Sequence, residues 1–199
     1  MTTMFHEGSR ELQDRFDTRR LADRIESLLV SDTISDHDRA FIEGRDMFFL
    51  ATSDEHGFPN CSYKGGDPGF VKVVDEHTIA FPVFDGNGMY LSAGNVLQNP
   101  HVGLLFIDFE RGNRMRFNGE ASIDAADPLL SEYPEAQFVV RVRAREVFPN
   151  CPRYIHKYEL VERSKFVPRA ACATPVPDWK RMDWAQDALP ANDPARNPA

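Results

Sequence analysis

The fold is decided between residues 61 and 121, where three motifs follow one another: Cys61-Ser62-Tyr63-Lys64-Gly65-Gly66, then Asp85-Gly86-Asn87-Gly88-Met89-Tyr90-Leu91-Ser92, then Arg114-Met115-Arg116-Phe117-Asn118-Gly119. The first motif is a short polar strand that runs into two glycines. The second enters a helix through glycine and asparagine, and a proline at position 100 ends that helix. The third alternates apolar and polar side chains, as a strand with one buried face does. Together the motifs predict a sheet that one helix crosses.

Strand patterns also dominate the chain around these motifs. Apolar runs or alternating segments occupy 46–53, 58–64, 102–109 and 138–145, mostly separated by turn residues. The pattern is typical of a mainly β protein, and we expect a six-stranded antiparallel split β-barrel with one crossover helix over 87–98.

Helices are expected to flank this barrel at the N- and C-terminal ends. Leucine and isoleucine at helical spacing predict one helix over 8–30, and proline near its first turn predicts another over 152–162. Ser35, followed by Asp38 three residues later, marks the start of a short helix. We divide the chain into an N-terminal helical segment (1–35), a barrel domain (36–163) and a proline-rich C-terminal arm (164–199).

The composition excludes several classes of protein. The 199 residues carry a net charge of −8, whereas nucleic-acid binding needs a basic surface. No apolar run approaches the roughly 18 residues of a membrane span, and no signal-peptide pattern opens the chain, so a cytoplasmic protein without membrane contact is expected. The three cysteines have no metal-site spacing, and we expect buried, reduced thiols. No nucleophile elbow, phosphate-binding loop or dinucleotide fingerprint supports a hydrolase or a nucleoside triphosphatase.

Three groups of polar residues are candidates for ligand binding. Lys64 ends a strand before two glycines, which let a ligand approach the backbone, although a solvated hairpin end has the same pattern. The segment Asn87-Gly88-Met89 opens a helix whose N–H groups favour an anion, and Ser92 and Asn95 share one face of that helix; ordinary capping is the alternative. Arg114 and Arg116 share one face of a strand, where they would bind a phosphate or face solvent.

In this order and spacing, the motifs resemble the FMN-binding split-barrel family related to pyridoxamine 5'-phosphate oxidase. The resemblance implies a homodimer that holds FMN in a cleft between its subunits, with both chains contributing. It also implies the following cofactor-binding residues: Cys61, Ser62, Tyr63, Lys64, Phe81, Pro82, Asn87, Gly88, Met89, Ser92, Asn95, Arg114 and Trp179.

The sequence departs from the oxidases in ways that argue against vitamin B6 oxidation. The oxidases carry a phosphate-binding arginine five residues before the strand lysine, where this chain has Pro59. The arginine- and histidine-containing segment that holds the substrate near their C-terminus is absent here. We therefore expect a related flavoprotein rather than the vitamin B6 oxidase.

The resulting hypothesis is an FMN-binding, oxidoreductase-like protein in which the flavin supplies the redox chemistry. No residue is assigned as catalytic acid or base, no metal is expected, and the substrate and electron donor are left open. A non-catalytic flavin, deazaflavin or haem binder or sensor on the same barrel is the alternative. A barrel used for protein association is a third, suggested by Arg141, Arg143 and Arg145.

Overall fold

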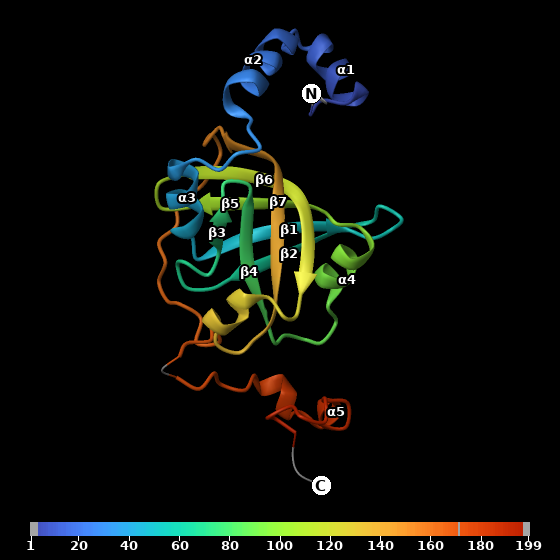
Figure 1. The fold of residues 1–199 in the computed structure, drawn as a ribbon, viewed down its shortest axis with the longest axis vertical. Coiled ribbons are helices and arrows are strands. Elements are labelled where there is room, and N and C mark those ends of the chain that lie inside the picture. The colour runs from blue at the N-terminus through green and yellow to red at the C-terminus, as the bar shows by residue number, and fades with distance from the viewer. Residues whose placement is uncertain (1–3, 171, 197–199) are drawn as a thin grey trace. The chain divides into compact units, whose positions relative to one another are not determined.

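The computed structural model describes residues 4–170 and 172–196. The chain divides into two compact units, Met1–Glu159 and Leu160–Ala199, and each is described by itself. The first unit contains the sheet and most of the helices (Figure 1). It also contains both of the pockets discussed below.

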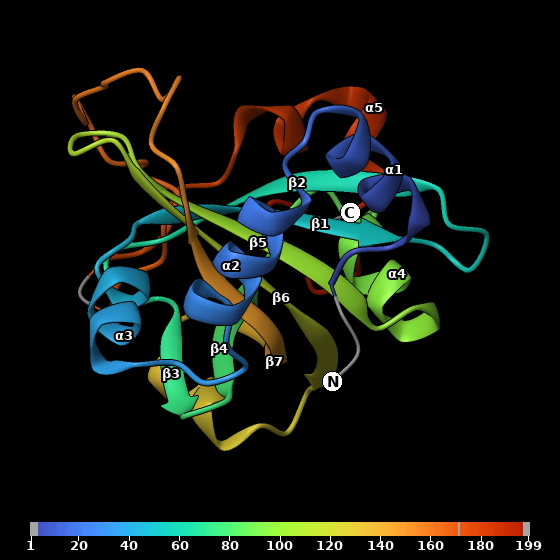
Figure 2. The ribbon, with the colours of Figure 1, turned by 90° about the horizontal axis from the view of Figure 1, so that it is seen from above.

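Seven strands form one antiparallel sheet in the order β2-β1-β5-β6-β7-β4-β3 (Figures 1 and 2). Their bounds are β1 Met47–Ser53, β2 Pro59–Gly65, β3 Lys72–Asp75, β4 Thr78–Phe84, β5 His101–Asp108, β6 Asn113–Asp124 and β7 Ala136–Asn150. The expected antiparallel sheet is confirmed, but the expected count of six strands is wrong. The edge strand β3 is only four residues long and pairs with β4 alone, across the short turn at Glu76 and His77. With its helices the chain is mixed α and β rather than mainly β.

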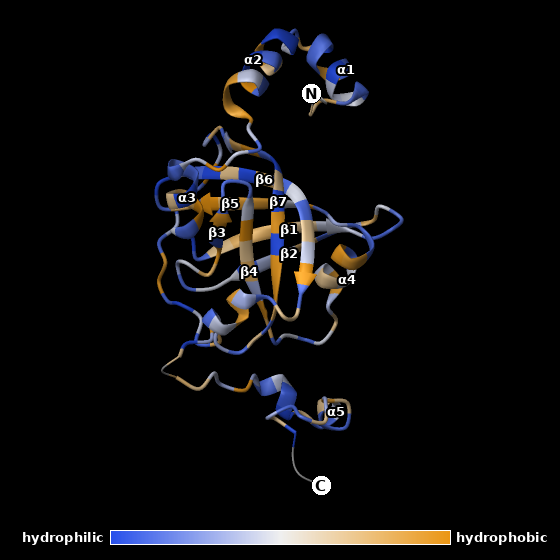
Figure 3. Ribbon diagram, in the orientation of Figure 1, coloured by the Kyte–Doolittle hydropathy of each residue, from blue (hydrophilic) through white to orange (hydrophobic). Residues whose placement is uncertain are grey.

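The core lies on the inner face of this curved sheet. Phe48, Phe81, Phe106 and Phe117 come from four strands and are fully buried. The ring of Phe48 lies 5.0 Å from that of Phe81 and 5.1 Å from that of Phe106, within the range of favourable aromatic contacts. Figure 3 shows that β5, which lies between β1 and β6, is hydrophobic along most of its length.

The crossover helix α4, Leu91–Gln98, connects β4 to β5 and packs against β1, β2 and β6. It begins four residues later than expected. Gly88 and Tyr90 have φ angles of 74° and 48°, so the backbone before Leu91 is left-handed and cannot belong to a right-handed helix. The expected helix at Ser35 is confirmed as α3, Asp36–Glu43, with the Ser35–Asp38 capping box formed.

The helix expected over 8–30 is two helices, α1 Glu7–Arg15 and α2 Arg19–Leu29. Asp17 has a φ of 51°, which breaks the helix between them. Neither helix contains a buried residue, and Leu21, Ile25, Leu28 and Leu29 are all exposed.

The helix expected over 152–162 is wrong, because this segment has no regular secondary structure. Tyr154 has a φ of 72°, and Val161 is 97% exposed, so the segment has neither a helical backbone nor a buried apolar face. A 3₁₀ turn, η1, is found at Pro128–Glu132.

The second unit has its own small core. It contains the 3₁₀ turn η2, Asp178–Arg181, and the helix α5, Asp183–Gln186, with Ala185 and Leu189 buried. Lys180 and Asp193 form an ion pair of 2.7 Å with both side chains buried. The rings of Trp179 and Trp184 stack with their centres 5.9 Å apart.

Candidate functional site

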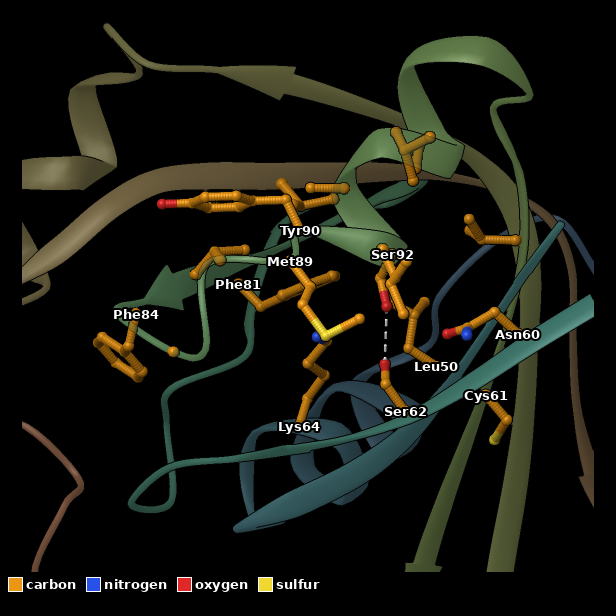
Figure 4. A pocket seen from close by; sticks show the side chains of 18 of the residues that line it. Leu50, Asn60, Cys61, Ser62, Lys64, Phe81, Phe84, Met89, Tyr90 and Ser92 are labelled. Carbon is orange, nitrogen blue, oxygen red and sulfur yellow. Dashed lines mark hydrogen bonds between the residues drawn. The ribbon is translucent and has the colours of Figure 1, made fainter. Parts of the chain in front are cut away.

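A pocket of about 330 Å³ opens between β2, the β4–α4 loop and the start of α4 (Figure 4). This volume lies at the low end of the range for small-molecule sites. The pocket reaches inward to apolar side chains of the sheet, and its polar groups come from β2, the loop and α4. It is lined by Leu50, Asn60, Cys61, Ser62, Lys64, Phe81, Val83, Phe84, Gly86, Asn87, Gly88, Met89, Tyr90, Leu91, Ser92, Ala93, Val96, Val102, Ala121 and Val140.

Strand β2 supplies the polar wall of this pocket. Because side chains alternate along a strand, Asn60, Ser62 and Lys64 share the face that lines the pocket. Tyr63 lies on the other face, where its ring is 6.2 Å from that of Phe49. The β1–β2 register, in which Phe48 pairs with Lys64, fixes this assignment.

Lys64 is a partly buried cation without a compensating charge. Burial lowers the pKa of its ammonium group below the usual value. Among the described residues, no carboxylate or hydrogen-bond acceptor is paired with this ammonium group. Figure 4 shows Lys64 extending from β2 toward Met89, across the pocket. An anion bound here would restore the stabilisation that the ammonium group loses on leaving water.

The start of α4 forms the opposite wall. The first N–H groups of a helix have no partner within the helix and carry the positive end of its dipole. Ser92 in this first turn is 9% exposed, and its hydroxyl oxygen lies 3.0 Å from that of Ser62. Two hydroxyl groups, the helix start and the Lys64 ammonium therefore line the same pocket, and this combination of groups suits an oxyanion.

The loop before α4 is held in an unusual backbone conformation. The side-chain oxygen of Asn87 accepts the N–H of Met89 at 3.1 Å, and the Tyr90 hydroxyl donates to Gln137 at 2.9 Å. Tyr90 between these contacts lies in the left-handed region, which non-glycine residues seldom adopt. The loop places Met89 and Tyr90 at the mouth of the pocket (Figure 4).

Eight of the thirteen sequence-predicted residues line this one pocket: Cys61, Ser62, Lys64, Phe81, Asn87, Gly88, Met89 and Ser92. The other five do not line it. Tyr63 faces away, and the Asn95 amide donates to Thr52 at 3.0 Å. Pro82 is buried in β4, opposite Val139 of β7.

Arg114 and Trp179 lie elsewhere. Arg114 lines a second pocket and donates to the backbone oxygen of Cys151 at 3.1 Å. It is seven positions before Ala121 on β6, and a strand of that length spans about 23 Å. Trp179 belongs to the second unit.

Apart from Phe81 and Met89, sequence reasoning missed the apolar wall, and it also missed two polar members. Asn60 has a detectable signal, because it is two residues before Ser62 on the same strand face. Tyr90 has none, since its left-handed backbone is visible only in the structure. The three cysteines are exposed rather than buried as expected, and Cys61 lines the pocket.

The sequence matches the family model described as pyridoxamine 5'-phosphate oxidase over residues 34–163. Among curated proteins, none matches the sequence. In the described part of the chain, no helix has the length and apolar character to cross a membrane.

Several solved structures are similar to this one at low identity. HupZ of Group A Streptococcus is 19% identical over 63% of this chain and 99% of that one, with a TM-score of 0.48. An FMN-binding protein from Syntrophomonas wolfei is 13% identical over 70% and 97%, with a TM-score of 0.45. HutZ, a heme storage protein from Vibrio cholerae, is 18% identical over 58% and 94%, with a TM-score of 0.44.

The family match covers the whole sheet, α3, α4 and every residue that lines the pocket. On this match, the chain belongs to the pyridoxamine 5'-phosphate oxidase family.

Proposed function

We propose that this protein binds FMN in the pocket between β2 and α4 and acts as a flavin-dependent, oxidoreductase-like protein. The observation that carries the proposal is Lys64, a partly buried cation without a counter-charge that faces the Ser62–Ser92 pair and the start of α4. This arrangement suits a phosphate group, and the apolar wall of the pocket suits the flat part of a flavin.

The residues present have the chemistry that FMN requires. Lys64, Ser62 and Ser92 would hold charged or polar oxygens of the cofactor. Phe81, Val83 and Met89 would exclude water from its apolar part. When bound, the flavin would supply hydride and electron transfer, and the chain would supply orientation and electrostatics. The Lys64 charge would favour an anionic form of the bound group.

The cleft of the proposed site would be completed by a second copy of the chain. A pocket of about 330 Å³ leaves little spare room for a nucleotide-sized cofactor. Arg114 would join the site only across a subunit boundary, because it lines another cavity of its own chain. Light scattering on the purified protein checks this: a dimer is expected, and a monomer that still holds flavin would contradict the shared cleft.

The test of cofactor identity is an absorbance spectrum of the purified protein, with the released cofactor identified by mass. Flavin bands and the mass of FMN are expected. A Soret band would instead indicate haem, and the mass of a deazaflavin would identify that cofactor in place of FMN. A colourless protein that takes up no FMN would reject the proposal. Bound flavin that no nicotinamide donor reduces would favour storage or sensing over turnover.

The site assignment is tested with Lys64→Ala combined with Ser92→Ala, which should release the flavin. The matched control is Lys72→Ala, because Lys72 pairs with Glu132 and does not line the pocket. Unchanged FMN stoichiometry in the double variant would place the cofactor elsewhere.

A further inference from the structure

The polar face of α2 is covered by α1. The three contacts that join α2 to the chain before it are Arg10–Asp23 and Asp14–Arg19, each at 2.5 Å, and the backbone N–H of Met4 to Glu26 at 2.8 Å. The residues that α2 contributes, Arg19, Asp23 and Glu26, are spaced four and three apart, so they share one face of the helix. The two helices are therefore joined by charged and polar groups.

The apolar face of α2 points the other way. Leu21, Ile25 and Leu28 have the same spacing but are displaced by two residues from the polar set, which is about 200° around a helix of 3.6 residues per turn. Together with Leu29 they form the α2 stripe, whose side chains are between 42% and 69% exposed. A surface helix normally turns such a stripe toward the core. Within the described residues, no part of the chain buries this one.

The end of α2 is fixed to the sheet close to the stripe. Ser31 exchanges two backbone hydrogen bonds with Val147 of β7, at 3.1 and 2.6 Å. Only Val30 separates this anchor from the last residue of the helix, so α2 is not joined to the sheet by a long flexible linker. Figure 1 shows α1 and α2 beyond the end of the sheet. The stripe is thus presented outward, at a fixed point of attachment.

The size and chemistry of the stripe fit a second copy of this chain. Its four side chains expose roughly 400 Å² of apolar surface, a large part of the apolar share of the ~800 Å² that each partner buries in a standard interface. The stripe contains no charge, so two copies of it can meet without like charges between them. The net charge of −8 disfavours the other surface that an amphipathic helix could bind, an anionic membrane.

From these observations we propose that the α2 stripe pairs with the α2 stripe of a second copy. Ile25 is in the middle of the stripe, so it faces its own counterpart whether the two helices run parallel or antiparallel. The helix ends before residue 34, where the family match begins, and no residue of α2 lines either pocket. This contact between subunits therefore lies apart from the flavin cleft and does not depend on FMN.

The first experiment oxidises the full-length Ile25→Cys variant and maps its disulfides by mass spectrometry. A disulfide that joins position 25 to position 25 links two copies, whatever the three native cysteines do. We expect it to form faster, by about tenfold or more, than the 27-to-27 disulfide of the matched control Ser27→Cys. Ser27 is exposed and lies two residues further along α2, so it points away from the stripe. Equal rates for the two variants would overturn the proposal.

The second measurement is amide hydrogen exchange of residues 19–29 in the full-length protein. A helix of this length without packing is marginal in water, so slow exchange requires that the stripe is covered. Ile25→Asn should raise the exchange rate by about tenfold, whereas Ser27→Asn, which places the same side chain on the other face, should not. Fast exchange in the wild type, or slow exchange that Ile25→Asn leaves unchanged, would overturn the proposal. Slow exchange without the 25-to-25 disulfide would show that another surface covers the stripe and would overturn it as well.

Discussion

The hydroxyl oxygens of Ser62 and Ser92 lie 3.0 Å apart and join the polar face of β2 to the first turn of α4. The two residues are 30 positions apart in the chain, and their bond closes one side of the first pocket. It thereby fixes the distance between the strand that presents Lys64 and the helix start that faces it.

This bond is expected to couple the two elements energetically. Ser62→Ala and Ser92→Ala should each lower the free energy of unfolding. The loss in the double variant should be smaller than the sum of the two single losses by about 0.5–1.5 kcal/mol. Urea unfolding of the four proteins in the cycle measures this coupling. Additive effects would show that the hydroxyl groups contribute independently.

Replacing Lys64 by methionine should stabilise the free protein at neutral pH, because the charged form is penalised by burial. The pKa of Lys64 is lower in the folded state than its ordinary value of 10.5. Between these two values the unfolded chain binds more protons, so the stability of the wild-type protein gains as pH rises through this window.

The gain in stability of Lys64→Met over the wild type should therefore become smaller as pH approaches 10.5. The measurement is the difference in free energy of unfolding between variant and wild type across this pH range. Lys72→Met serves as the control, since Lys72 is paired with Glu132. A pH-independent difference for Lys64→Met would contradict the lowered pKa.

The second unit should lose its structure in acid. Burial alone would raise the pKa of Asp193, but the Lys180 ammonium and the N–H of Ala195 hold it below its usual 3.8. Because the folded-state pKa is lowered, the stabilisation is present above 3.8 and is lost as pH falls through the folded value. Trp179 and Trp184 are the two tryptophans of the chain and stack within this unit, so near-UV circular dichroism reports on it.

Asp193→Asn provides the comparison for this acid transition. It removes the charge at every pH, so its tryptophan signal should be weaker than that of the wild type at neutral pH and should not change further through the same acid range. A wild-type signal that persists unchanged well below 3.8 would show that the ion pair does not hold the unit together.

Gly119→Ala should destabilise the sheet by about 1–3 kcal/mol or more. A Cβ at this position would lie 2.1 Å from the backbone oxygen of Arg143, where β6 and β7 shift register. Gly86→Ala is the control, because no atom lies within 4 Å of its Cβ and its φ is not positive. Equal urea midpoints for the two variants would mean that β6 and β7 accommodate the added methyl group without loss of stability.

The parts of the fold that follow from local pattern could be predicted. The alternation of β2 places Ser62 and Lys64 on one face, and the Ser35–Asp38 spacing marks the start of α3. Prediction from local sequence pattern failed where the apolar side chains of a segment do not pack against another part of the protein. Leu28 in α2 and Val161 after β7 are exposed, so periodicity there says little about burial or helix formation.

The composition of the candidate site required the three-dimensional structure. Arg114 and Ala121 belong to one continuous strand, yet its length places them in different pockets. The left-handed Tyr90 bonds through its hydroxyl to Gln137, 47 residues away, a contact that no local pattern contains. Phe81 was found through family resemblance, and its pocket neighbours Val102 and Val140 meet it only through the order of the strands.

Because β2 assigns its residues to two faces by simple alternation, the tolerance of this strand to insertions differs from its tolerance to substitutions. A substitution at Ser62 changes one group in the pocket, whereas one extra residue between the Gly57 turn and Ser62 would move every later residue to the opposite face. Tyr63 would then point into the cavity and Lys64 into solvent. The evolutionary record of this strand should therefore contain many exchanged side chains but few changes in length, and any gain of one residue should be offset by a bulge before Lys64.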